Sequence, residues 1–137
     1  MNTLRSSSWS RMLFLGVVAL GPAAVRAEPL SLASYNVENY GSANRLTEAG
    51  YRQDYPKPEA QKQALRTVIR GLNADVLVLQ EMGGPAHLEE LRRDLRAEGC
   101  DYPHAALASA ADEARRLAIL SRRPLGSVVT HADLQFK

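Results

Sequence analysis

The sequence has few of the residues that mark disulfide-stapled or zinc-bound proteins. Cys100 is the only cysteine among 137 residues, and the three histidines are scattered along the chain. A single cysteine excludes an intramolecular disulfide framework, and no Cys/His cluster has the spacing of a structural zinc site. The formal net charge is +2, so charge alone does not indicate a nucleic-acid partner. With 45% hydrophobic and 23% charged residues, the composition is that of one globular domain.

Long hydrophobic runs are also scarce, and the one that stands out lies near the N-terminus. Residues 12–20 form an apolar run about half the ~20 residues that a membrane-spanning helix needs. Two arginines precede the run, Gly21-Pro22 ends it, and small residues lead up to Ala27. This pattern predicts an export signal over residues 1–27, cleaved near Ala27–Glu28, with no stable membrane span afterwards. The alternative is a buried N-terminal helix, but the segment has no amphipathic period.

Loss of the signal changes the net charge of the chain, and the presence of such a signal predicts where the protein is located. The predicted domain, residues 28–137, keeps 14 basic and 15 acidic residues, a net charge of −1, in a chain of 110 residues. That length suffices for a small core. We expect an exported protein, either periplasmic or extracellular, in which the free Cys100 is a small buried residue without a chemical role.

The first half of this domain predicts a strand, a loop and a helix. Residues 30–37 have the composition of a strand, and the polar stretch 39–57 predicts a long loop with at most one helical turn. Pro58 then begins a helix at the position where its missing N–H costs nothing. The predicted buried stripe of this helix consists of Leu65, Val68, Ile69 and Leu72. Its predicted solvent-facing side consists of Gln61, Lys62, Arg66 and Arg70.

The second half alternates in the same way, which favours an α/β (α+β) fold. Residues 75–81 contain four consecutive apolar residues and predict a buried strand. A second helix follows, with Gly99 as its stop signal. Its predicted core face consists of Leu88, Leu91 and Leu95. Further strands are predicted over residues 102–107 and 117–121, and another over residues 126–132.

Polar side chains occur where two of these strands end. Asn36 and Glu38 are two residues apart, so they share a face if the extended conformation persists, and Glu81 follows the buried apolar run. Ligand clefts commonly lie at such strand ends, and Mg²⁺ needs only one or two protein carboxylates beside its waters and substrate oxygens. From spacing alone, the alternative is that Glu81 is the first solvated residue of a turn and that Asn36 is a turn former.

Three segments resemble the endonuclease/exonuclease/phosphatase superfamily of metal-dependent phosphoesterases. Residues 32–39 (LASYNVEN) resemble its opening strand, and residues 74–81 (ADVLVLQE) resemble its second signature, an apolar strand that ends in Gln-Glu. Residues 116–125 (RLAILSRRPL) resemble a third, less specific stretch. The order and separation of the segments agree with the family, and the resemblance covers residues 30–132.

The resemblance implies a fold, a cofactor and roles for individual residues. The family fold is a four-layer sandwich of two mostly antiparallel sheets flanked by helices. Glu81 resembles the principal metal-binding glutamate, and Asn36 resembles the asparagine that holds the scissile phosphate. Glu38 occupies a position where some members place an acidic residue near the metal, and Gln80 resembles a polar neighbour that orients the site. The implied cofactor is Mg²⁺, or else Mn²⁺ or Ca²⁺. The implied substrate is a phosphate ester, such as nucleic acid, a lipid headgroup or a small phosphoester, and no protein partner is predicted.

The sequence also departs from the family pattern. The family's later Gly-Asp-x-Asn motif and Asp-His pair do not occur, and none of the histidines His87, His104 and His131 follows an aspartate. Hydrolysis needs a positioned base as well as a metal. We therefore interpret the chain as the N-terminal part of the fold, expected to be marginally stable and to have little or no activity alone. We interpret the three histidines as surface or strand-edge residues.

Other interpretations remain open at this stage. A non-catalytic exported binding module that keeps the scaffold is the main alternative, and an unrelated α/β domain with accidental matches is a third. The densest basic group could face a phosphate-rich ligand, although a solvated loop and strand edge is the favoured interpretation. That group consists of Arg115, Arg116, Arg122 and Arg123.

Overall fold

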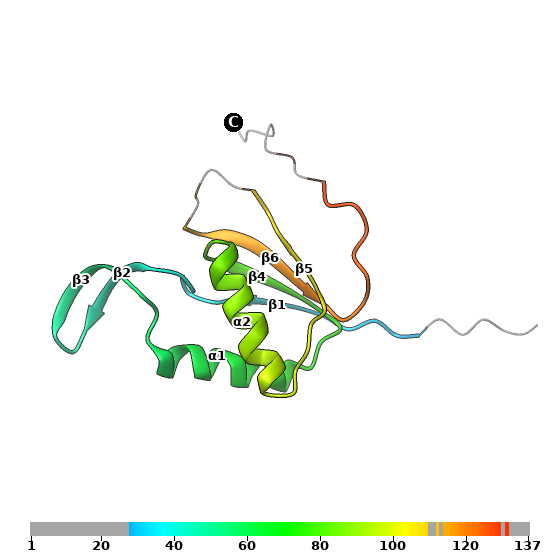
Figure 1. Ribbon diagram of the computed structural model, residues 1–137, viewed down its shortest axis with the longest axis horizontal. Coiled ribbons are helices and arrows are strands. Elements are labelled where there is room, and N and C mark those ends of the chain that lie inside the picture. The colour runs from blue at the N-terminus through cyan, green and yellow to red at the C-terminus, as the bar shows by residue number, and fades with distance from the viewer. Residues whose placement is uncertain (1–27, 110–111, 113, 130, 132–137) are drawn as a thin grey trace, which may run out of the picture.

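The structure, a computed structural model, describes residues 28–109, 112, 114–129 and 131. The predicted export signal, residues 1–27, lies outside the described residues. In chain order the elements are β1 (Leu32–Asn36), β2 (Ala43–Thr47), β3 (Gly50–Tyr55), α1 (Glu59–Leu72), β4 (Val76–Met82), α2 (Pro85–Ala97), β5 (His104–Leu107) and β6 (Arg116–Ser121) (Figure 1). Within the described ranges, no helix is long and apolar enough to cross a membrane.

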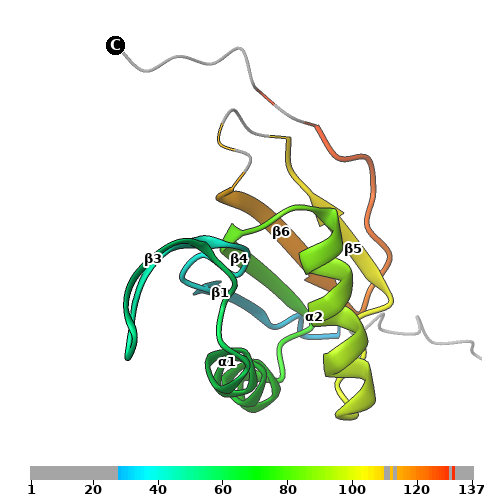
Figure 2. The same ribbon diagram turned by 60° about the vertical axis from the view of Figure 1, so that its left-hand side comes forward.

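The main sheet is mixed and has four strands. Its order is β1-β4-β6-β5, with β1 parallel to β4 and the other two pairs antiparallel. The parallel pair needs a crossover connection, which consists of the β2–β3 hairpin followed by α1. Both helices lie on the same side of this sheet (Figure 2). This confirms an α/β fold, and the described residues form one layer of helices and one main sheet rather than the full sandwich that the resemblance implies.

The core lies between the sheet and the two helices. Alternate residues of β4 and β6, among them Leu77, Leu79 and Leu120, face the helices and are fully buried. The helices contribute a contiguous set of apolar side chains to this core, namely Leu65, Ile69, Leu88, Leu91 and Leu95. Cys100 is buried at its edge, as the sequence predicts. The other face of the sheet has Leu32 and Leu117 exposed, so the apolar packing is one-sided.

Residues 39–57 are not a long loop, and that prediction is wrong. They contain a β-hairpin, the antiparallel strands β2 and β3, which projects beside the main sheet (Figure 1). The residues that favoured a loop form the connections instead, and Gly50 supplies the positive φ of 99° at the turn. Half-buried and exposed residues alternate along β2, but the half-buried positions include Arg45 and Thr47 while Leu46 is exposed, so the sequence shows no apolar period there.

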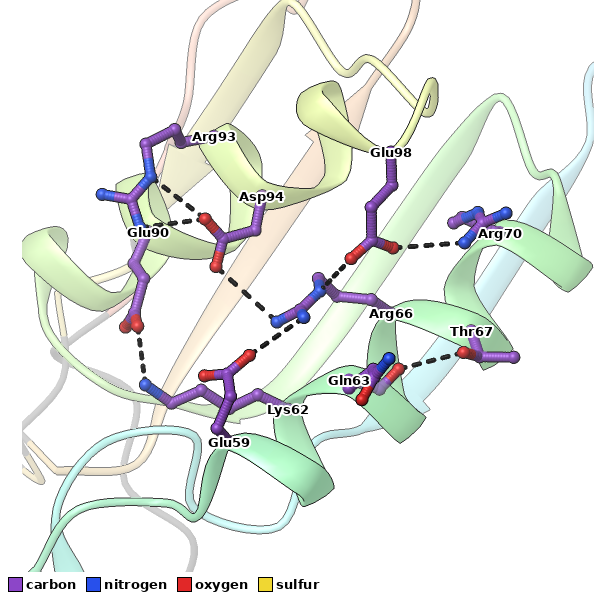
Figure 3. Close-up of polar contacts among 10 residues, drawn as sticks. All are labelled: Glu59, Lys62, Gln63, Arg66, Thr67, Arg70, Glu90, Arg93, Asp94 and Glu98. Carbon is purple, nitrogen blue, oxygen red and sulfur yellow. Dashed lines mark hydrogen bonds and ion pairs between the residues drawn. The ribbon is translucent and has the colours of Figure 1, made fainter.

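The predicted faces of α1 are partly wrong. Leu65 and Ile69 are buried as predicted, but Val68 is 43% exposed and Leu72 is 45% exposed. Arg66, predicted to be solvated, is only 7% exposed because the carboxylates of Asp94 in α2 and of Glu98, which follows it, pack over it (Figure 3). The reason is that α2 covers a side of α1 whose residues are charged, so ion pairs replace apolar contacts there.

The predicted strand over residues 126–132 is also not found across its described part, residues 126–129, and residues 130 and 132 are not described. A strand needs a partner for its backbone groups. Both sides of β6 are taken by β4 and β5, so the chain that follows could pair only at the outer edges of the sheet, β1 or β5, and residues 126–129 pair with neither.

Candidate functional site

The polar residues of interest lie where β1 and β4 end side by side. The two strands are parallel, and Asn36 is the register partner of Gln80. The backbone N–H of Val37 continues the ladder by donating to the Gln80 carbonyl at 3.0 Å. Parallel pairing therefore brings the carboxyl ends of the two predicted motifs together at one edge of the sheet, which is where ligand sites of such sheets lie.

A bulge in β4 decides where the Glu81 side chain goes. Leu79 pairs with Ala118 of β6 and Met82 pairs with Arg116. Between these two pairs, β4 therefore contains one residue more than β6, which is a β-bulge. Strict alternation would place residue 81 on the core face with Leu77 and Leu79. The extra residue lets Met82, which is fully buried, fill that core position. Glu81 is thereby spared burial in the apolar core and remains half-buried beside the end of β1.

The side-chain oxygens of Asn36 and Glu81 hold consecutive amides of the same loop. Asn36 Oδ1 accepts a hydrogen bond from the backbone N–H of Glu38 at 2.8 Å. Glu81 Oε2 accepts one from the backbone N–H of Asn39 at 3.2 Å. The Glu81 carbonyl also accepts from the Tyr40 N–H at 3.0 Å. Because both side chains bind the loop that follows β1, both oxygens are held at the same corner of the site.

Backbone strain gathers at this corner. Glu38, Asn39 and Glu81 all have positive φ, at 50°, 53° and 60°, which L-residues with side chains rarely adopt. Each such residue costs on the order of 1–3 kcal/mol and persists only where its surroundings fix it. Three of them at two neighbouring strand ends indicate that the surrounding hydrogen bonds hold this corner in one arrangement.

Glu38 and Gln80 lie differently from each other. The extended conformation ends at Asn36, and Glu38 has a φ of 50°, so the condition under which the two side chains would share a face is not met. Its side chain lines cavities that are also lined by Gln61 of α1, the larger of about 710 Å³ between the β2–β3 hairpin and the start of α1. Gln80 keeps to the face of Asn36, and its Nε2 donates to Ser34 Oγ. Gln80 therefore lies on the sheet face that carries Ser34 and Asn36.

A buried lysine that the sequence analysis did not single out lies next to both glutamates. Lys57 is 4% exposed, and its Nζ donates to the Glu38 carbonyl at 3.0 Å. Burial lowers the pKa of Lys57, and the charge of Arg45 lowers it further, while Glu38 and Glu81 oppose the shift. No local sequence signal marked Lys57 or Arg45, because both lie in the stretch that was predicted to be a loop.

His87 braces the two loops of the site from the start of α2. It was expected at the surface, but its Nδ1 is buried and makes no hydrogen bond within the part of the chain that is described. A Cβ placed on Gly83 would lie 2.6 Å from that nitrogen, and one on Gly41 would lie 3.2 Å from His87 Cε1. The imidazole thus occupies the space that the two glycines leave open. His104 begins the edge strand β5 and His131 is exposed, as predicted.

The arginines of the densest basic group serve structural contacts. Arg115 pairs with Asp112 at 2.8 Å and Arg123 pairs with Glu28 at 2.6 Å. Arg122 donates to the side-chain oxygen of Asn73 at 2.7 Å, and its guanidinium lies over the ring of Tyr102. These contacts agree with the predicted loop and strand edge.

The donor set fits a cation that keeps most of its water. Among the described residues, no three His, Cys, Asp or Glu side chains form a cluster able to hold a metal ion. A closed cage of protein ligands is thus not what these residues offer. Mg²⁺ needs no such cage, because one or two carboxylates with water and substrate oxygens complete its shell. The Glu81 carboxylate and the Asn36 amide oxygen have the chemistry of such ligands, and hydrogen bonds hold both to the loop that follows β1.

Fold and site together define an α/β protein with polar residues converging at the carboxyl ends of two parallel strands. A sequence model of the endonuclease/exonuclease/phosphatase family matches residues 33–137, most of the chain, and the chain belongs to that family. The family comprises metal-dependent phosphoesterases, which typically use divalent metals. Searches of curated proteins and of solved structures gave no significant match.

Proposed function

We propose that this chain supplies the Glu81–Asn36 part of a divalent-cation site for the hydrolysis of phosphodiester or phosphomonoester bonds. The observation that carries the proposal is the bulge in β4, which spares Glu81 from the core and leaves it beside the end of β1. A carboxylate at the end of a buried strand is expensive to desolvate unless it meets a cation or reaches solvent. A bulge kept at this position is the kind of feature that re-aims a side chain next to an active site.

Each residue then has a definite task. Glu81 is the principal ligand for Mg²⁺, with Mn²⁺ or Ca²⁺ as substitutes, and Glu38 contributes negative charge nearby. Asn36 holds a phosphoryl oxygen through its amide. Gln80, which is held by its hydrogen bond to Ser34, helps to orient the site beside Asn36. When bound, the cation polarises the phosphoryl group and neutralises charge on the leaving oxygen. Lys57 donates to the Glu38 carbonyl, and the charges of Glu38 and Glu81 favour its charged form against the effects of burial and Arg45, which lower its pKa.

Water activation is the part for which the sequence offers no residue. The Gly-Asp-x-Asn and Asp-His motifs do not occur in the sequence, and a metal without a positioned base supplies only part of the rate. We therefore propose that the 137-residue chain binds a cation and phosphate but hydrolyses phosphoesters slowly or not at all. The absence of these motifs equally favours the second candidate, an exported binding module that keeps the scaffold without the chemistry.

The substrate is proposed only as a class. Nucleic acid, a lipid headgroup and a small phosphoester all present the phosphoryl oxygens that this corner is suited to hold. Nucleases usually add a basic surface for the backbone, and the densest arginine group of this chain is engaged in structural contacts. We propose export to the periplasm or the extracellular space on the basis of residues 1–27 alone.

Calorimetric titration with Mn²⁺ tests the cation site. We expect the full chain to bind Mn²⁺ weakly, to bind it more tightly when inorganic phosphate is present, and to lose at least tenfold in affinity on Glu81→Gln, since the variant lacks the main anionic ligand. Glu48→Gln is the matched control, because Glu48 is exposed at the hairpin turn and has no ion pair among the described residues. Equal Mn²⁺ affinity in the wild type and Glu81→Gln would contradict the proposal.

Hydrolysis separates the two candidate functions. If the full chain cleaves a model phosphodiester with Mg²⁺ and loses that activity on Glu81→Ala, the expectation of an inactive chain is wrong and the enzyme candidate is favoured. Mn²⁺ binding that phosphate strengthens, without turnover, agrees with the expectation of an inactive chain.

A further inference from the structure

The loop that follows β1 turns its carbonyls toward two cations. Arg45 of β2 donates from Nη2 to the carbonyls of Asn39 and Gly41, the latter at 2.9 Å. Lys57, between β3 and α1, donates to the carbonyl of Glu38 at 3.0 Å. Three of the four carbonyls of residues 38–41 are thus bound by two charged side chains. We call this pair, Arg45 and Lys57, the cation clamp.

The clamp also ties the loop to the hairpin. Arg45 Nε donates to the Tyr55 carbonyl at 3.2 Å, so a single guanidinium joins the loop to the end of β3. A planar guanidinium can serve several carbonyls at once, which an ammonium on a flexible stem cannot do with the same geometry. Arg45 is half-buried while Arg52, its partner across the hairpin, is exposed. The two arginines therefore differ in role although they share one register position.

Placing Arg45 close to two other cations, Arg52 and Lys57, costs free energy. Like charges opposite one another on a hairpin are destabilising, as are two cations close together in a half-buried place. Burial and the nearby Arg45 both disfavour the charged form of Lys57. The residues that gain from it are Glu38 and Asn39, whose left-handed conformations need outside support.

The same loop holds the Glu81 side chain. Its Asn39 N–H donates to Glu81 Oε2, and its Tyr40 N–H donates to the Glu81 carbonyl. The clamp binds the carbonyl side of this loop and Glu81 binds the amide side. A loop held on one side only would be free to leave the left-handed conformation, and the Asn39 bond to the carboxylate would be lost with it.

We propose that Arg45 and Lys57 are positioning residues that fix the Glu81 carboxylate through the loop of residues 38–41. The β2–β3 hairpin thus contributes to the geometry of the site, because it carries Arg45. That the Glu81 carboxylate binds a cation rests on the proposed function. The link from Arg45 through Asn39 to Glu81 rests only on the hydrogen bonds described above. Neither Arg45 nor Lys57 is assigned contact with substrate.

Amide hydrogen exchange of the full chain tests the mechanical link without any metal. In Arg45→Gln we expect the amides of Asn39 and Tyr40 to exchange about tenfold faster, because the loop opens locally, while those of Leu77 and Leu120 in the sheet change less than twofold. Arg52→Gln is the matched control from the same register position; it relieves the like-charge repulsion and should not accelerate the exchange of any of the four amides. Arg45→Lys, which keeps the charge but not the fork, should fall between.

Mn²⁺ titration of the same variants tests the link to the site. Arg45→Gln should weaken Mn²⁺ binding about fivefold or more, since the carboxylate is no longer preorganised, and Arg52→Gln should not. If Glu81→Gln leaves Mn²⁺ binding unchanged, the proposed function fails while the exchange result still decides the clamp. Unchanged Asn39 and Tyr40 exchange in Arg45→Gln, or equal acceleration of Leu77 and Leu120, overturns the clamp.

Discussion

Replacement of Arg66 by methionine is expected to lower the free energy of unfolding by about 3 kcal/mol, a large share of the stability of a small domain. Arg66 lies on α1 and faces three carboxylates. Its Nε donates to Glu98 at 2.6 Å, its Nη2 donates to Glu59 at 2.9 Å, and its Nη1 lies 3.6 Å from Asp94 (Figure 3). Loss of the guanidinium would leave the carboxylates of Asp94 in α2 and of Glu98, just after it, close together without a shared counter-ion.

The pKa of Arg66 indicates that its contacts outweigh its burial. Burial disfavours the charged form, but hydrogen bonds to Glu98 and Glu59 act against it and raise the pKa above its ordinary value. The guanidinium is therefore stabilised in its charged form by these partners. Asp94 and Glu98 are about a quarter exposed, so water reaches them when Arg66 is removed. For that reason we expect the lower end of the 3–5 kcal/mol range for a broken buried pair.

Urea unfolding of matched variants measures the effect. Arg70→Met is the control, because Arg70 is 48% exposed and, among the residues that the structure describes, forms an ion pair with Glu98 alone, at 3.3 Å. We expect that variant to lose less than about 1 kcal/mol. Equal losses in Arg66→Met and Arg70→Met would show that the network on α1 and α2 is no stronger than an ordinary surface ion pair.

Substitution of Gly83 by alanine is the second large effect, expected to cost about 1–3 kcal/mol because it overpacks the junction of the two site loops. The new Cβ would lie 2.6 Å from His87 Nδ1 and 3.1 Å from the Cα of Gly41. The Gly41 contact is backbone and cannot yield by a side-chain rotation. The substitution should also weaken Mn²⁺ binding, since Gly83 is two residues from Glu81.

Gly84 offers a neighbouring control. A Cβ there meets nothing within 4 Å, and its backbone has φ −68° and ψ −178°, which alanine tolerates. Alanine is less favourable than glycine at the start of α2, but it also lowers the entropy of the unfolded chain. Because these two effects oppose each other, we expect Gly84→Ala to change the free energy of unfolding by less than about 0.5 kcal/mol. In a His87→Ala background, the cost of Gly83→Ala should fall. An undiminished cost in that background would mean that His87 is not the obstacle.

The sequence predicts the elements whose patterns are strong and local. The apolar run of residues 76–79 and the leucine spacing of α2 predict a buried strand and a helix, and both are present. The family membership follows from the segments around Asn36 and Glu81 and is confirmed. The place of those two residues at one edge follows from parallel pairing, which an intervening helix makes the natural topology.

Features that depend on tertiary partners could not be predicted. The hairpin was hidden by its polar and glycine-containing sequence, and with it the cation clamp of Arg45 and Lys57. Burial of Arg66 depends on which side of α1 the carboxylates of α2 cover, and helical periodicity alone does not contain that information. The bulge at Glu81 could not be predicted either, because a strict two-residue period does not reveal it. The register of β4 with β6 and the burial of Met82 show it in the structure.

The central claim is that the strand-end oxygens of Glu81 and Asn36 share a divalent cation. Paramagnetic broadening by substoichiometric Mn²⁺ tests it most directly, because the effect falls off steeply with distance from the ion. We predict that the amide signals of Glu38, Asn39 and Glu81 broaden first in the full chain and stay sharp in Glu81→Gln. Broadening that begins at the hairpin turn around Glu48, or that persists in Glu81→Gln, would contradict the account.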